Sequence, residues 1–84
     1  MPTISTVSNR LRLYRERVGL RQTDIARLLD LQSADRISRW EHGIAMPNVT
    51  NLFKLAVLYK VPPQELYGEL FDTINGTVLP NENA

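Results

Sequence analysis

The sequence predicts a compact all-α domain of five short helices. Apolar residues recur at helical spacing in five successive segments, and serine, asparagine, glycine and proline stand where helices would begin or end. The chain has 84 residues, of which 43% are hydrophobic and 23% charged, as expected of one small globular domain. Connections of about three to six residues suit a helical bundle.

The first helix is expected to start after Ser8 or Asn9, which are both good N-caps, and to end at Val18, before Gly19. Its buried stripe has i, i+3, i+7 spacing: Leu11, Tyr14 and Val18. The second helix is expected over 23–29. A turn of small and polar residues follows over 30–33, and a third helix is expected over about 34–42, closed by Gly43.

Asn48 is expected to cap a fourth helix over 49–59, which shows the strongest helical period in the chain. Val61-Pro62-Pro63 is expected to open a short fifth helix that runs to about Phe71, because proline is tolerated in a first turn. We therefore divide the chain into an N-terminal extension (1–8), a helical domain (9–71) and a C-terminal tail (72–84).

The tail contains a β-hairpin signal. Apolar and polar residues alternate around Asn75-Gly76. A hairpin or strand here would need a partner surface, such as a second copy, because an isolated hairpin is marginal in water. The alternative is a flexible tail in which Asn-Gly occurs by chance.

Composition excludes several classes of site. The chain has no cysteine and a single histidine, so neither a disulfide nor a metal site is expected, and a reducing cytoplasm is the natural location. No apolar stretch is long enough to cross a membrane, and residues 1–8 do not resemble a secretory signal. With no nucleophile–base pair and no phosphate-cradling glycine loop, we expect neither an enzyme nor a cofactor.

Charge is distributed unevenly along the chain. The net charge is only +1, but residues 8–43 hold all eight arginines against five carboxylates, and the rest holds two lysines against four carboxylates. A planar guanidinium suits phosphates and base edges better than an ammonium group does. This asymmetry supports a nucleic-acid partner, although a solvated helical face would also explain it.

Two short helices joined by a tight turn, with the second polar on one side, form an arrangement that can enter the DNA major groove. Ile37 and Trp40 would anchor the third helix to the core, leaving Asp35, Arg36 and Arg39 exposed on its other face. The runs Gln22-Thr23-Asp24-Ile25-Ala26 and Ile37-Ser38-Arg39-Trp40-Glu41-His42-Gly43 resemble the lambda-repressor/Cro-type helix-turn-helix family. The resemblance extends over about residues 9–70.

This resemblance implies roles for individual residues. Base-reading positions on the third helix correspond to Ala34, Asp35, Arg36 and Arg39. Phosphate-binding positions correspond to Arg21, Gln22, Thr23 and Trp40. Arg15 and Glu41 correspond to a pair that ties the first helix to the third in many members.

Several of these residues have a structural alternative. Gln22 could cap its helix, Trp40 could belong to the core, and His42 is expected to be only a C-terminal helix residue. Asp35 could accept a hydrogen bond from cytosine N4, but its carboxylate would repel phosphate.

The chain departs from the family pattern in the turn between the second and third helices. This turn is one residue longer than usual, and Asp30 stands where the family has glycine. The longer turn leaves two possible registers for residues 34–36 relative to the groove. From Ile37 onward the alignment is firm, so Arg39 is the preferred base-reading residue.

The expected function is that of a sequence-specific regulator of double-stranded DNA, most simply a repressor of phage, plasmid or bacterial type. It would act as a homodimer on a palindromic operator, because one module of this size buries little DNA surface. The alternative is an antitoxin, or a subunit that grips a protein partner with the same fold.

Overall fold

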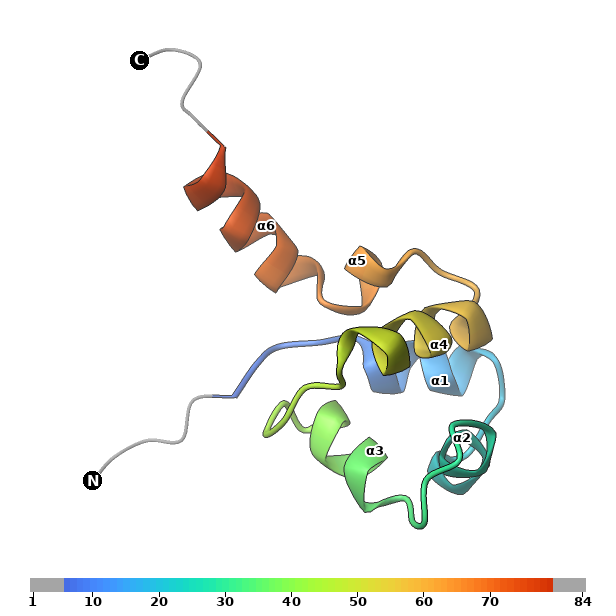
Figure 1. Ribbon diagram of the computed structural model, residues 1–84. Helices are drawn as coiled ribbons and strands as arrows, with labels where there is room; N and C mark the ends of the chain where they lie inside the picture. The colour runs from blue at the N-terminus through green and yellow to red at the C-terminus, as the bar shows by residue number, and fades with distance from the viewer. Residues whose placement is uncertain (1–5, 80–84) are drawn as a thin grey trace, which may run out of the picture.

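The computed structural model describes residues 6–79, and that range contains helices and no strands. The elements are α1 (Leu11–Arg17), α2 (Gln22–Leu28), α3 (Asp35–Glu41), α4 (Val49–Tyr59), α5 (Pro63–Leu66) and α6 (Gly68–Val78). The predicted all-α fold is confirmed. Figure 1 shows that α1 to α5 gather into one body, while α6 extends away from it on the side opposite the α2–α3 turn.

The core takes one fully buried side chain from each of the first five helices: Leu11, Ile25, Ile37, Leu55 and Leu66. Trp40, Tyr59 and Tyr67 enlarge this cluster with aromatic rings. Burial of each such side chain is worth about 1.5–3 kcal/mol, so these five helices hold one another in place. Helix α6 contributes no buried residue.

The first four helices end in the same way, with a residue in the left-handed conformation whose successor bonds back into the last turn. These residues are Gly19, Asp30, Gly43 and Lys60, with φ of 74°, 60°, 74° and 61°. After α2, for example, the Asp30 N–H donates to Arg27 O (3.1 Å) and the Leu31 N–H donates to Ala26 O (2.8 Å). Asp30 thus performs the helix-ending role that the family gives to glycine.

Helix α4 has the bounds and the cap that the sequence predicts. Asn48 Oδ1 accepts a hydrogen bond from the Asn51 N–H at 2.8 Å, which satisfies one of the free donors of the first turn. The first three expected helices differ from the observed ones by one or two residues at their ends, where helices commonly fray.

The structure corrects two expectations for the C-terminal part. The fifth helix does not run to Phe71 but ends at Leu66, because Tyr67 leaves the helical conformation (φ −129°, ψ 51°). Neither the hairpin that Asn75-Gly76 could form nor the alternative of a flexible tail is found at these residues, which lie in α6. Within residues 6–79 no strand is available to pair with such a hairpin, whereas Thr73 Oγ1 bonds back to Glu69 O (2.9 Å) along the helix.

The expected N-terminal extension and C-terminal tail fall partly outside the described residues, which exclude 1–5 and 80–84. Val7, from the extension, donates its N–H to Gly43 O at 3.0 Å and packs against the core. Helix α6 runs across the expected boundary between residues 71 and 72.

Candidate nucleic-acid interface

Helix α3 has one buried and one exposed face. Ile37 and Trp40 are buried, whereas Asp35, Arg36 and Arg39 are exposed on the other side. Three of the four expected base-reading residues therefore share an open surface. The fourth, Ala34, is the residue before α3 and packs half-buried against the core.

The position of Ala34 shows which side chains in the first turn of α3 are exposed. Because Ala34 faces the core, the exposed surface of α3 begins at Asp35 and continues through Arg36 to Arg39. Arg36 and Arg39 are three residues apart and so lie on neighbouring turns of one face. No protein carboxylate pairs with either guanidinium within residues 6–79, so both can bind an external acceptor.

The expected pair Arg15–Glu41 is present and nearly buried. Arg15 Nε donates to Glu41 Oε2 at 2.6 Å and Arg15 Nη2 donates to Oε1 at 3.1 Å. The side chains are only 11% and 3% exposed. The hydrogen bond from Arg15 to Glu41 is the main reason that the pKa of Arg15 is raised above its ordinary value. The fork geometry joins α1 to the last turn of α3.

Gln22 completes a junction of three helices. Its Nε2 donates to Glu41 Oε1 at 3.0 Å, so a side chain at the start of α2 reaches the end of α3. We call Arg15, Gln22 and Glu41 the Glu41 junction. The amide nitrogen of Gln22 is therefore directed at a carboxylate of its own chain, and its role here is to hold α3 against α2.

The other two expected phosphate contacts at the start of α2, Arg21 and Thr23, are exposed. Arg21 lies over Asp24, with Nε 3.3 Å from Oδ2, and the same oxygen accepts the Arg21 N–H at 2.8 Å. These hydrogen bonds from Arg21 lower the pKa of Asp24 below its ordinary value. To bind a DNA phosphate, the guanidinium of Arg21 would have to leave the Asp24 carboxylate.

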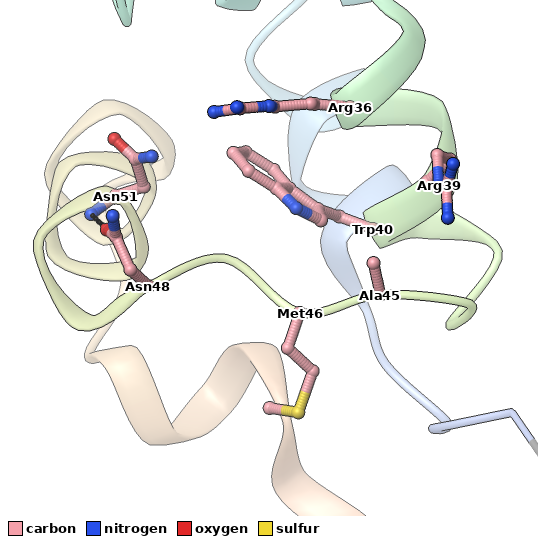
Figure 2. A pocket seen from close by; sticks show the side chains of 7 residues that line it. All are labelled: Arg36, Arg39, Trp40, Ala45, Met46, Asn48 and Asn51. Atoms are coloured by element: carbon pink, nitrogen blue, oxygen red, sulfur yellow. Dashed lines mark hydrogen bonds between the residues drawn. The ribbon is translucent and has the colours of Figure 1, made fainter.

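A pocket of about 310 Å³ lies between α3 and the start of α4, lined by Arg36, Trp40, Asn48 and Asn51 among others; we call it the α3 pocket. Figure 2 shows the Arg36 side chain extending across the Trp40 ring toward the two asparagines, while Arg39 points away to the other side. Trp40 is buried, so the core role proposed for it is present, but one part of its ring faces this pocket.

The sequence does not indicate Asn48 and Asn51 as residues of the site. It predicts Asn48 only as a helix cap, and its Oδ1 performs that role. Nothing in the spacing of the chain shows that the first turn of α4 lies beside Arg36. With Arg36 they bring side-chain N–H donors to one concave surface, an arrangement suited to an anionic oxygen.

His42 is a C-terminal residue of α3, as expected, with Nδ1 2.7 Å from the Ser38 carbonyl oxygen. Among residues 6–79, no group of three histidine, cysteine or acidic side chains is placed to hold a metal ion. None of the helices in this range is long and apolar enough to span a membrane.

A comparison with protein families gives one match. The helix-turn-helix family model matches residues 11–66, which include α1 to α5 and exclude α6. No curated protein and no solved structure matches the chain. The match covers most of the chain and contains the α2–α3 unit with its exposed arginines. The chain therefore belongs to the Cro/lambda-repressor type of the helix-turn-helix family, and it is a DNA-binding regulator.

Proposed function

We propose that the protein is a cytoplasmic, sequence-specific repressor that inserts α3 into the major groove of double-stranded DNA. The observation that carries this proposal is the division of α3 into two faces. Ile37 and Trp40 fix one face in the core, and Arg36 and Arg39 stand without a carboxylate partner on the other, among residues 6–79. A helix held in this way presents its side chains to base edges without moving its backbone.

Arg39 is the principal base-reading residue in this proposal. An arginine directed at guanine can donate to both O6 and N7, which is worth about 1–3 kcal/mol of discrimination. Asp35, one turn earlier, is exposed and can accept from cytosine N4. Its carboxylate also disfavours a register that would bring it beside a phosphate.

Contacts to the DNA phosphate backbone would flank α3 on both sides. On one side, Arg21 and Thr23 at the start of α2 are open to a phosphate. On the other side, the α3 pocket offers N–H donors from Arg36 and Asn48. Such contacts set the position of the protein on the duplex, while base contacts set the sequence. Gln22 contributes indirectly, through the Glu41 junction.

A homodimer on a palindromic operator best fits a module of this size. One small domain buries only about 600–1,000 Å² on DNA, and two copies reading half-sites about one helical turn apart multiply both affinity and specificity. Each copy would present its α3 to one major groove.

Selection from a randomised pool of DNA duplexes tests this proposal. Enrichment of a palindromic sequence with guanine at the Arg39 position, and binding that weakens as salt rises, are the expected results. The matched comparison is Arg39→Ala against Arg12→Ala, an exposed arginine on α1 that pairs with Glu16. Failure to enrich any sequence, with no salt-sensitive binding, would refute the repressor role.

A second candidate is an antitoxin or another subunit that binds a protein with this fold. Exposed apolar side chains on α4 favour it, because Phe53 and Val57 are 53% and 76% exposed. Apolar groups clustered on a surface often mark a protein contact. Co-purification of one defined partner in equal amounts, together with loss of operator binding in its presence, would support this candidate.

A further inference from the structure

The helical conformation of α6 is not explained by its own sequence. It has 11 residues and none of them is buried. Isolated helices shorter than about 12–15 residues are marginal in water even for good helix formers. The second half of α6, from Thr73 to Val78, consists of residues with weak helix propensity: Thr73, Ile74, Asn75, Gly76, Thr77 and Val78. Leu70 packs partly buried against the core, but the rest of α6 needs a covering surface from outside the helix to account for its conformation.

The face that needs covering is an apolar stripe. Phe71, Ile74 and Val78 stand at i, i+3 and i+7, and each is about half exposed or more. Glu69 and Asp72 lie on the opposite side of the helix. We call these three apolar residues the α6 stripe. In Figure 1 the helix projects from the bundle rather than folding back over it.

The start of α6 lies close to Arg10. The guanidinium of Arg10 lies directly against Gly68, the first residue of α6. Arg10 Nη1 also donates to Glu65 O at 3.4 Å. Arg10 therefore contacts both the end of α5 and the start of α6.

The bundle has an apolar groove of matching length. It encloses about 520 Å³ between α2 and α4, with Leu28, Phe53 and Val57 at its surface. We call it the α2–α4 groove. The groove lining runs along α4 from Thr50 to Leu58, about 12 Å, which is close to the ~10 Å that the α6 stripe covers from Phe71 to Val78. It shares no residue with the α3 pocket.

The net charges of the two helices are opposite. Helix α4 carries Lys54, at the groove, and is followed by Lys60; these are the only lysines of the chain, and α4 has no acidic residue. Helix α6 carries Glu69 and Asp72 and no basic residue. Because these carboxylates lie away from the α6 stripe, they act at long range: two α6 helices repel each other as they approach, whereas α6 and α4 attract.

We propose that α6 of each copy lies in the α2–α4 groove of a second copy, so that two chains exchange their C-terminal helices. A contact between α6 stripes alone would cover little area against the roughly 1,000 Å² of a stable interface, and it would leave the groove exposed. Reciprocal exchange forms the contact twice and covers both apolar surfaces in both copies. This proposal rests on the homodimer of the proposed function and adds to it how the two copies contact each other.

The test is self-association of the full chain without DNA, measured by sedimentation velocity over a range of concentrations. Three exposed apolar residues are replaced: Ile74→Glu on the α6 stripe, Val57→Lys in the α2–α4 groove, and Leu13→Glu on α1 as the matched control. Circular dichroism and thermal melting establish that each variant keeps the fold of α1 to α5.

The wild type is expected to dimerise, and Leu13→Glu to dimerise equally well. Ile74→Glu and Val57→Lys should each raise the dimer dissociation constant roughly a hundredfold, since the altered contact occurs twice and each loss is worth about tenfold. An equal mixture of the two variants should dimerise again. In the mixed dimer one contact is wild type on both sides, and the other joins the two substituted positions, whose introduced carboxylate and ammonium groups carry opposite charges.

Other outcomes overturn the inference. A monomeric wild type would show that no second copy covers these surfaces. Loss of association in Ile74→Glu but not in Val57→Lys would place α6 against α6, and a mixture that stays monomeric would exclude exchange. The proposed function is judged separately by operator selection. A dimer of this kind that selects no DNA refutes only the function, and a monomer that selects an operator refutes only the exchange.

Discussion

The side-chain amide of Asn9 donates to the backbone carbonyl of Trp40 at 3.0 Å, so a residue that precedes α1 caps the end of α3. The same Nδ2 lies 3.3 Å from Glu41 O, and Oδ1 accepts the Leu11 N–H at 3.1 Å. One asparagine therefore accepts from the first N–H of α1 and donates to the end of α3. The sequence indicates the first of these roles only.

Asn9→Ala should lower the free energy of unfolding by about 2 kcal/mol, since it removes the acceptor of the Leu11 N–H and leaves helix-end carbonyls without their donor. Urea unfolding measures this change. Asn9→Asp keeps the acceptor for Leu11, but its cost should be at least as large because a carboxylate oxygen would face those carbonyls. Ser8→Ala, at a neighbouring exposed position, is the control. Equal stability of Asn9→Ala and Ser8→Ala would contradict this account.

Glu41→Gln should cost about 3–5 kcal/mol of unfolding free energy, because Arg15 would keep its charge in a nearly buried position without a counter-charge. Gln22→Ala removes only a neutral donor and should cost about 1 kcal/mol. A double-mutant cycle with Arg15→Ala measures the coupling between the two charges. If Glu41→Gln proved as mild as Gln22→Ala, the Glu41 junction would not be the link described.

A comparison of Gly19 with Gly43 separates the strain of a left-handed backbone conformation from the steric collision of an added Cβ. Both have φ of 74°, but a Cβ at Gly43 would collide with the backbone of Val7, whereas a Cβ at Gly19 meets nothing. Gly19→Ala should therefore cost about 1–2 kcal/mol, the strain of a left-handed alanine. Gly43→Ala should cost clearly more. Equal melting temperatures for the two variants would mean that residues 6–9 shift to make room for the added Cβ at no measurable cost in stability.

Tyr67→Phe should leave stability at neutral pH unchanged or slightly raised, because the Tyr67 hydroxyl is buried with no partner among the described residues. Burial raises the pKa of Tyr67 from 10.0 to about 12. The folded state thus holds this proton more tightly than the unfolded chain does. The corresponding stability is complete below pH 10 and is lost as pH rises toward about 12.

Unfolding midpoints of wild type and Tyr67→Phe, compared between neutral pH and pH 12, test this linkage. The variant should lose stability less steeply in the alkaline range. Some slope should remain, since burial also raises the pKa of Tyr59. Parallel curves would show that Tyr67 ionises as readily in the folded state as in the unfolded one.

Arg39→Ala should relax the base preference at one position of the operator, with a loss of about 1–3 kcal/mol of discrimination there. Arg21→Ala should instead weaken binding to all sequences and reduce the salt slope by about one. Asp24→Asn should do the reverse of Arg21→Ala, because it releases Arg21 from its partner. Fluorescence anisotropy at several salt concentrations measures all three. A salt slope unchanged in Arg21→Ala would remove that residue from the phosphate contacts.

The sequence predicts α1 to α4 well because the signals at their ends are local. Asn48 caps α4 from within its own turn, and Gly19 and Gly43 supply left-handed conformations where helices stop. The exposed face of α3 follows from the spacing of Ile37 and Trp40. These features depend on neighbours within a few residues, which a single sequence contains.

The features that the sequence does not reveal depend on distant contacts. Asn75-Gly76 suits a hairpin locally, yet a hairpin needs a strand to pair with, and residues 6–79 provide none. The contribution of Asn48 and Asn51 to the α3 pocket depends on how α4 crosses α3. Ala34 could be assigned to either face until the conformation of the longer turn was known.

The C-terminal end of α3 is held by hydrogen bonds from Asn9, and Glu41 joins it to α1 and α2. Its backbone is thus ordered before any duplex approaches, so association with DNA requires little loss of main-chain entropy in the reading helix. We expect its amide hydrogens to exchange with solvent only when the whole bundle unfolds. Discrimination between operators then depends mainly on the rotamer of Arg39, which stands on a rigid support.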